Sequence, residues 1–195
     1  MMNDRNHAKI ILASKSPRRI KLLELLGIDF DVCTAYFKEK KLETASKTVT
    51  FNSEGKATTI SDMLPGNVVL AGDTVVDVDG EQIGKPADIY TARKVLEFLS
   101  GKTHRVTTAV SMKISGHDAV TELSESFVVF DRLTNDTIDN YLQLVNVTDK
   151  AGAYGIQEYG YLLINNVTGE VSNVMGFPLV ATFKLLRLAR KLGFI

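Results

Sequence analysis

The segment 10–27, IILASKSPRRIKLLELLG, constrains the fold most, because it joins an apolar strand to an amphipathic helix through a tight turn. The strand is the run IILA at 10–13. Ser16 is placed to cap the helix, and Pro17 suits its first position because the N–H that proline lacks would be unpaired there anyway. Leucines at helical spacing predict a buried stripe, and Gly27 predicts the end of the helix.

Arg18 and Arg19 fall in the first turn of this helix, where the positive end of the helix dipole disfavours cations. Together with free backbone N–H groups and the hydroxyls of Ser14 and Ser16, they predict a phosphate-binding site. The alternative is that both arginines point into solvent, and the segment alone does not decide between the two. If only the dipole acts on Arg19, its replacement by Glu leaves the ligand-free protein as stable or more stable, by roughly 0.3–1 kcal/mol.

Length and charge place the chain in a broad class. It has 195 residues, enough for one domain with a buried core, so we expect residues 1–195 to form a single domain. A formal net charge of zero argues against a nucleic-acid binder or a membrane-surface binder. The lone Cys33, the polar N-terminus and the lack of a long apolar run predict a cytoplasmic protein with a reduced thiol.

The order of the remaining elements indicates an α/β protein with a mixed sheet. Residues 75–83 read as a hairpin around Asp79-Gly80, and residues 36–43 as a surface loop. Caps are expected at Ser46, Asp88 and Thr134. The other strands are expected at 29–34, 68–71, 105–114, 119–130, 161–165 and 169–172, and the other helices at 46–63, 89–99, 134–144 and 178–192.

Asp73 is the sharpest candidate for chemistry, since Gly-Asp-Thr follows the apolar run VVLA at 68–71. The exit of a buried strand is where α/β proteins place site residues, although an Asp there can also cap a turn. Lys85, in a Gly-Lys-Pro turn, could aim a point charge at a phosphate, and Gln157 offers both a donor and an acceptor to a base edge. Lys56 is ambiguous. For each of these three the alternative is an ordinary surface residue. The three histidines are far apart in sequence, and this spacing argues against a metal site built from histidines.

Taken together, several segments resemble the Maf family of nucleoside triphosphate pyrophosphatases, first named for septum formation. The matching segments, in family order, are LASKSPRR (12–19), AGDTVV (71–76), IGKP (83–86), LSGKTHRVTTAV (99–110), DKAGAYGIQ (149–157) and NVMGFPL (173–179). The resemblance implies a fold like that of the inosine triphosphatases, with an elongated mixed sheet, flanking helices, and two lobes around a nucleotide-binding cleft. It also implies hydrolysis of a nucleotide to the monophosphate and pyrophosphate, and a homodimer.

The resemblance extends to substrate and metal. Arg18, Thr74 and Gln157 match the branch that acts on dTTP and UTP rather than on 7-methyl-GTP. A divalent cation, Mg²⁺ first and Mn²⁺ or Co²⁺ as alternatives, would bind Glu39 and Asp73, and Asp73 could also accept a proton. The remaining site residues are Arg18, Arg19, Lys56 and Lys85 for the triphosphate charge, Ser14 and Ser16 for phosphate oxygens, and Gln157 for the base.

The chain departs from the family pattern at two places that bear on the site. Glu39 stands beside Lys38 where the family has an acidic pair, and Glu158 replaces a usual glycine after Gln157. A second hypothesis is a non-catalytic regulator of cell division or septum formation that binds nucleotide or nucleic acid without turnover. Zero net charge and the retained charged groups argue against it.

Overall fold

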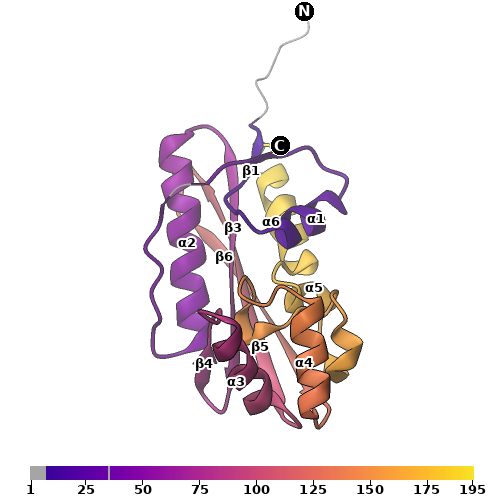
Figure 1. Ribbon diagram of the computed structural model, residues 1–195. Helices are drawn as coiled ribbons and strands as arrows, with labels where there is room; N and C mark the ends of the chain where they lie inside the picture. The colour runs from indigo at the N-terminus through magenta and orange to yellow at the C-terminus, as the bar shows by residue number, and fades with distance from the viewer. Residues whose placement is uncertain (1–7, 35) are drawn as a thin grey trace, which may run out of the picture.

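A mixed sheet of seven strands organises the described residues, 8–34 and 36–195 of the computed structural model (Figure 1). The strand order is β2-β1-β3-β5-β6-β7, with β4 paired to β3 outside this path. β1 is parallel to both β2 and β3, and the other pairs are antiparallel, so the expected α/β class with a mixed sheet is confirmed. The strands are β1 (Ile10–Leu12), β2 (Asp31–Val32), β3 (Val68–Val78), β4 (Glu81–Ile83), β5 (Thr103–Ile114), β6 (Val120–Phe130) and β7 (Ile164–Thr168).

Helices cover the sheet in three groups. Figure 1 shows α2 lying along one side of the sheet, α1 and α6 near the chain ends, and α3 and α4 at the opposite end. Apolar positions at helical spacing explain the packing of α1 and α3, which bury Leu22 and Leu23, and Ala92, Leu96 and Leu99, whereas α2 buries a mixed face of apolar and polar residues. The helices are α1 (Pro17–Glu24), α2 (Ala45–Met63), α3 (Ile89–Leu99), α4 (Asn135–Leu144), α5 (Val171–Val174) and α6 (Leu179–Lys191), with 3₁₀ turns η1 (Ala151–Ala153) and η2 (Gly160–Leu162).

The long strand β3 passes through two hydrophobic clusters. Val68 and Leu70 belong to the cluster beneath α1 and α6, whereas Val76 and Val78 belong to the cluster beneath α3 and α4. The polar residues of the Gly-Asp-Thr sequence therefore lie between the two clusters. Burial of both neighbouring stretches fixes the strand on either side of them.

Several local expectations need correction. Thr44, rather than Ser46, caps α2 by accepting a hydrogen bond from the Lys47 N–H at 3.2 Å. The strand expected at 29–34 is reduced to β2. The two strands expected at 161–165 and 169–172 are instead η2, β7 and the start of α5, because β7 runs through the expected turn and pairs with β6 up to Phe127↔Thr168.

The caps at Ser16, Asp88 and Thr134 lie where the sequence predicts them. His7 and the rest of the polar N-terminus lie outside the described residues. None of the helices in residues 8–34 and 36–195 combines the length and apolar character needed to span a bilayer.

Candidate active site

A cavity opens where one edge of β3 changes partner. β1 pairs with β3 as far as Leu12↔Leu70, and β4 pairs with it from Val76↔Ile83 onwards. Asp73 lies in the stretch between these two partners. The expectation that it follows the strand is therefore wrong: β3 continues to Val78 because its other edge pairs with β5 throughout. The cavity has a volume of about 800 Å³, and its lining includes all ten site residues predicted from the sequence: Ser14, Ser16, Arg18, Arg19, Glu39, Lys56, Asp73, Thr74, Lys85 and Gln157.

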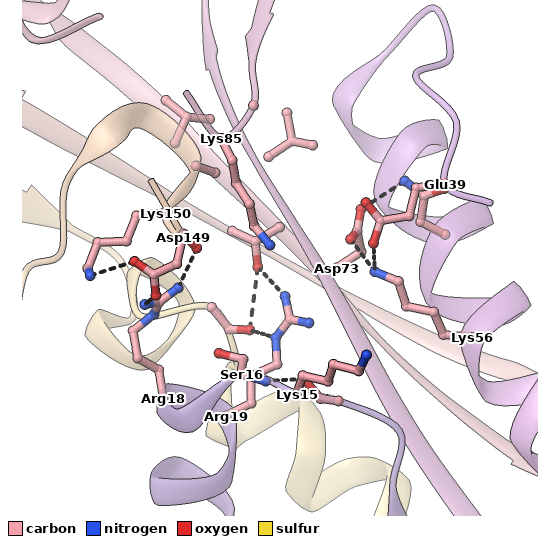
Figure 2. A pocket seen from close by; sticks show the side chains of 18 of the residues that line it. Lys15, Ser16, Arg18, Arg19, Glu39, Lys56, Asp73, Lys85, Asp149 and Lys150 are labelled. Carbon is pink, nitrogen blue, oxygen red and sulfur yellow. Dashed lines mark hydrogen bonds and ion pairs between the residues drawn. The ribbon is translucent and has the colours of Figure 1, made fainter. Parts of the chain in front are cut away.

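Two carboxylates meet one ammonium on the α2 side of the cavity (Figure 2). The Lys56 Nζ lies 2.7 Å from Asp73 Oδ1 and 2.6 Å from Glu39 Oε1. The second oxygen of Asp73 accepts a hydrogen bond from the Asn52 amide at 3.1 Å. Asn52 and Lys56 are four residues apart on α2 and so project from the same face of the helix. This side of the cavity thus holds two acidic groups on a single shared cation.

The loop that carries Glu39 is fixed against α2. The Asn52 side chain accepts from the Lys40 N–H at 2.9 Å and donates to the Lys40 carbonyl at 3.1 Å. Phe37 occupies the space beside Gly55, where an added Cβ would lie 2.1 Å from its ring. Partial burial raises the pKa of Glu39, but the hydrogen bond and charge of Lys56 outweigh this effect and lower it overall.

Arg19 braces the same stretch of β3 from the α1 side. Its guanidinium donates to the Gly72 carbonyl at 2.6 Å, the Gly176 carbonyl at 2.8 Å and the Thr74 hydroxyl at 3.2 Å. Burial lowers the pKa of Arg19, and the charge of Asp73 opposes that shift. The alternative in which this arginine points into solvent is wrong. These three hydrogen bonds also reverse the expected effect of Arg19→Glu on the stability of the ligand-free protein. The substitution is now expected to destabilise the protein, because the free energy gained from the helix dipole is smaller than that lost with the hydrogen bonds.

Arg18 is held on the opposite side of the cavity by Asp149. One guanidinium nitrogen lies 2.5 Å from Asp149 Oδ2 and another donates to the Asp149 carbonyl at 3.1 Å. Burial raises the pKa of Asp149, but hydrogen bonds from Lys150 and Arg18 lower it overall. These two contacts hold the guanidinium of Arg18 in one orientation.

The turn before α1 leaves a hydroxyl at the cavity wall. Ser14 Oγ accepts from the Ser16 N–H at 3.1 Å, which shapes the turn. Ser16 takes the N-cap position, but its hydroxyl makes no capping bond to the helix. It lines the cavity beside the first N–H groups of α1, an arrangement suited to an anion.

Lys85 and Gln157 complete the lining from two other loops. Figure 2 shows the Lys85 side chain extending into the space between the Arg18–Asp149 pair and Asp73. Gln157 donates from its amide nitrogen to Glu158 Oε1 at 2.8 Å. The cavity is thus cationic on the α1 and Lys85 sides and carries carboxylates on the α2 side.

Sequence reasoning missed three residues that position the predicted ones. Asn52 orients Asp73, Asp149 orients Arg18, and Lys150 contacts Asp149 from the next position in the chain. A polar Asn four residues before Lys56 on a helix was a usable signal for the first. The Asp-Lys pair in the matched segment 149–157 was a signal for the others.

A metal site with three or more acidic, histidine or cysteine side chains does not occur among the described residues. The donor set is instead the two carboxylates, whose nearest oxygens both reach the Lys56 ammonium. Oxygen donors of this kind suit a hard cation that takes its other ligands from phosphate and water.

Comparison with known proteins finds relatives that match nearly the whole chain. The family model described as Maf-like protein matches residues 9–189. A dTTP/UTP pyrophosphatase of Thermosipho africanus is 42% identical over 179 residues, which cover 91% of this chain and 92% of the relative. One of Pyrococcus furiosus is 38% identical over 94% of this chain and 97% of the relative. The solved Ham1 protein of Staphylococcus aureus is 16% identical, with a TM-score of 0.47 over 64% of this chain and 72% of that chain.

Proposed function

Because the chain belongs to the Maf family, we propose that it hydrolyses dTTP and UTP to the nucleoside monophosphate and pyrophosphate. One observation carries the proposal: the Glu39–Lys56–Asp73 cluster faces Arg18, Arg19 and Lys85 across a single cavity of about 800 Å³. Such a volume accommodates a nucleotide, and the cations suit its triphosphate. The names of the relatives supply the substrate class.

The reaction needs a water molecule directed at the α-phosphorus. Asp73 accepts one proton as the water oxygen bonds to phosphorus, and the second proton stays on the monophosphate. The bond between the α-phosphorus and the bridging oxygen breaks, and pyrophosphate leaves with the electron pair. Arg18 and Lys85 offset the charge that develops on the leaving group, while Lys56 holds Asp73 in place. Ser14 and Ser16 bind phosphate oxygens at the start of α1.

Glu39 and Asp73 are the residues that would hold a divalent cation, Mg²⁺ first and Mn²⁺ or Co²⁺ as alternatives. They fit because Mg²⁺ is commonly bound by one or two carboxylates together with substrate phosphates and water. When bound, the cation polarises a phosphoryl oxygen and lowers the pKa of a bound water. Lys56 contacts the same carboxylate oxygens and keeps them converged.

Gln157 reads the base with help from Arg18 and Thr74, which line the same cavity. The imide edge of uracil and thymine offers an N3–H donor and an O4 acceptor, which a carboxamide can match. We therefore expect dTTP and UTP as the best substrates, CTP as a weaker one, and ATP and GTP as poor ones. A buried polar group left unpaired costs about 1–3 kcal/mol, which corresponds to roughly tenfold to a hundredfold in kcat/KM.

The test is a nucleotide panel with product identification. Purified protein is incubated with dTTP, UTP, CTP, ATP and GTP, with Mg²⁺ or with EDTA. Inorganic phosphate is measured with and without added inorganic pyrophosphatase. We expect phosphate from UTP and dTTP only when the coupling enzyme is present, because the direct product is pyrophosphate. Phosphate release without it would indicate γ-cleavage, and binding without any product would favour the non-catalytic regulator.

A homodimer stays a prediction from the resemblance, and a cytoplasmic location stays a prediction from the sequence composition. Light scattering coupled to size-exclusion chromatography measures the first, with a mass near twice 21.5 kDa as the expected result.

A further inference from the structure

The segment that follows α4 contains a buried lysine whose ammonium contacts three oxygens of the protein. The Lys150 side chain is 4% exposed, and its ammonium contacts the Asn146 carbonyl at 2.5 Å, Asp149 Oδ1 at 2.8 Å and Glu158 Oε2 at 3.1 Å. The first two contacts are hydrogen bonds, and the contact with Glu158 is an ion pair. The ammonium is therefore directed at groups of the protein, although Lys150 borders the cavity.

Each of the two carboxylates that contact Lys150 also binds a residue that lines the cavity. Asp149 uses its other oxygen to bind Arg18, as Figure 2 shows. Glu158 uses its other oxygen to accept from the Gln157 amide at 2.8 Å. These five residues thus form one continuous series of hydrogen bonds and ion pairs, in the order Arg18, Asp149, Lys150, Glu158 and Gln157. Its two end residues, Arg18 and Gln157, both line the cavity.

The backbone of the segment is shaped for this approach. Gly155 leaves the required space, because an added Cβ would lie 2.9 Å from Lys150 Cε and 3.1 Å from Gln157 Nε2. Tyr159, directly after Glu158, has a φ of 54°, an uncommon conformation for a residue with a side chain. The Gly155 N–H donates to the buried Tyr141 hydroxyl at 2.9 Å, which anchors the segment on α4.

We propose that Lys150 and Glu158 are positioning residues that fix the Gln157 carboxamide with its nitrogen towards Glu158 and its oxygen free for the base. This inference rests on the proposed hydrolysis of pyrimidine nucleotides and deepens it. A carboxylate only accepts hydrogen bonds, so Glu158 can pair only with the amide nitrogen of Gln157. The freed oxygen accepts from the N3–H of uracil or thymine. Cytosine carries an acceptor at N3, so it meets an acceptor and is disfavoured.

Without this lock, the carboxamide of Gln157 could rotate by half a turn and present its nitrogen to cytosine. Glu158 therefore supplies discrimination against cytosine without touching the substrate. At position 158 this sequence departs from the family pattern, which usually has a glycine after the glutamine.

The decisive variant is Glu158→Gln, because the orientation of the new side chain is dictated by Lys150. The ammonium only donates, so it binds the oxygen of the introduced amide, whose nitrogen then faces Gln157. Gln157 can satisfy that nitrogen only with its own oxygen, which turns its amide nitrogen towards the base. We expect the UTP-to-CTP ratio of kcat/KM to fall at least tenfold. Glu158→Ala, which leaves Gln157 free to rotate, should give an intermediate ratio.

Binding is measured in parallel with turnover, using the non-hydrolysable α,β-imido analogues of UTP and CTP in calorimetry. The same Glu-to-Gln change at exposed Glu24, on α1, is the matched control and should leave the ratio unchanged. Thermal unfolding confirms that each variant is folded.

The two proposals fail separately. If the wild type releases no pyrophosphate, the proposed function fails, and the analogue affinities still report the base preference. If the Glu158→Gln ratio stays within twofold of the wild-type ratio in both binding and turnover, the positioning role is wrong. An equal loss with UTP and CTP would also overturn it, because a merely structural role lowers both alike.

Discussion

Replacement of Arg19 by Glu tests whether this residue braces β3 in the absence of nucleotide. The substitution removes donors to the Gly72 carbonyl, the Gly176 carbonyl and the Thr74 hydroxyl. Each hydrogen bond contributes about 1 kcal/mol to stability. A Glu in the first turn of α1 regains only about 0.3–1 kcal/mol from the helix dipole. The net loss is therefore about 2–3 kcal/mol, before any repulsion between the new carboxylate and Asp73.

For a chain of this length, a loss of that size lowers the melting temperature by roughly 4–12 °C. The measurement is thermal unfolding by circular dichroism without nucleotide, supported by urea denaturation at 25 °C. The matched control is Lys21→Glu, at an exposed position in the last turn of the same helix, where the dipole disfavours the new carboxylate, and it should lower stability by no more than about 1 kcal/mol. Nucleotide should raise the melting temperature of the wild type but not of the Arg19 variant. An Arg19→Glu protein that melts at or above the wild-type temperature would refute the bracing role.

Three further predictions concern catalysis, base preference and pH. Asp73→Asn should fold normally and retain nucleotide binding, while kcat for pyrophosphate release falls about 10²–10⁴-fold; a near wild-type kcat would remove Asp73 from the mechanism. Gln157→Leu should bring the kcat/KM values for UTP and CTP close together while pyrophosphate release persists, and an unchanged preference would contradict its role at the base. Burial lowers the pKa of His104 from 6.5 to about 4. The unfolded chain therefore binds the proton first, and stability is lost as pH falls from 6.5 to 4, by on the order of 3 kcal/mol. Urea unfolding at several pH values should show a smaller acid-induced loss of stability for His104→Gln than for the wild type.

The helices and long strands were predictable because their signals are local. Asp88 and Thr134 cap helices through the N–H groups three residues on, and the short-range pattern reveals both. The length of β3 was not predictable in this way. Its continuation past Asp73 is set by pairing with β5, for example Asp73↔Ala109, and a single strand's sequence does not encode its partner.

The residue types of the site were predictable, but their pairings were not. Arg19 reaches Gly176, and Arg18 reaches Asp149, across more than half of the chain. Arginines near the start of a helix predict that an anion binds there. In this structure, part of their hydrogen-bonding capacity is already used by a carboxylate and by backbone carbonyls of the protein. The position of Glu39 depends on how its loop packs on α2, which no motif in that loop reveals.

Helix α2 buries polar residues on the face that borders the cavity, including Thr48 and Asn52. Apolar replacements at such positions are a usual route to a more stable protein, since each buried aliphatic side chain contributes about 1.5–3 kcal/mol. At Asn52 the same change would release both Asp73 and the Lys40 backbone. Efforts to raise the thermal tolerance of this protein would therefore do better to modify the exposed face of α2 and leave its inner face as it is.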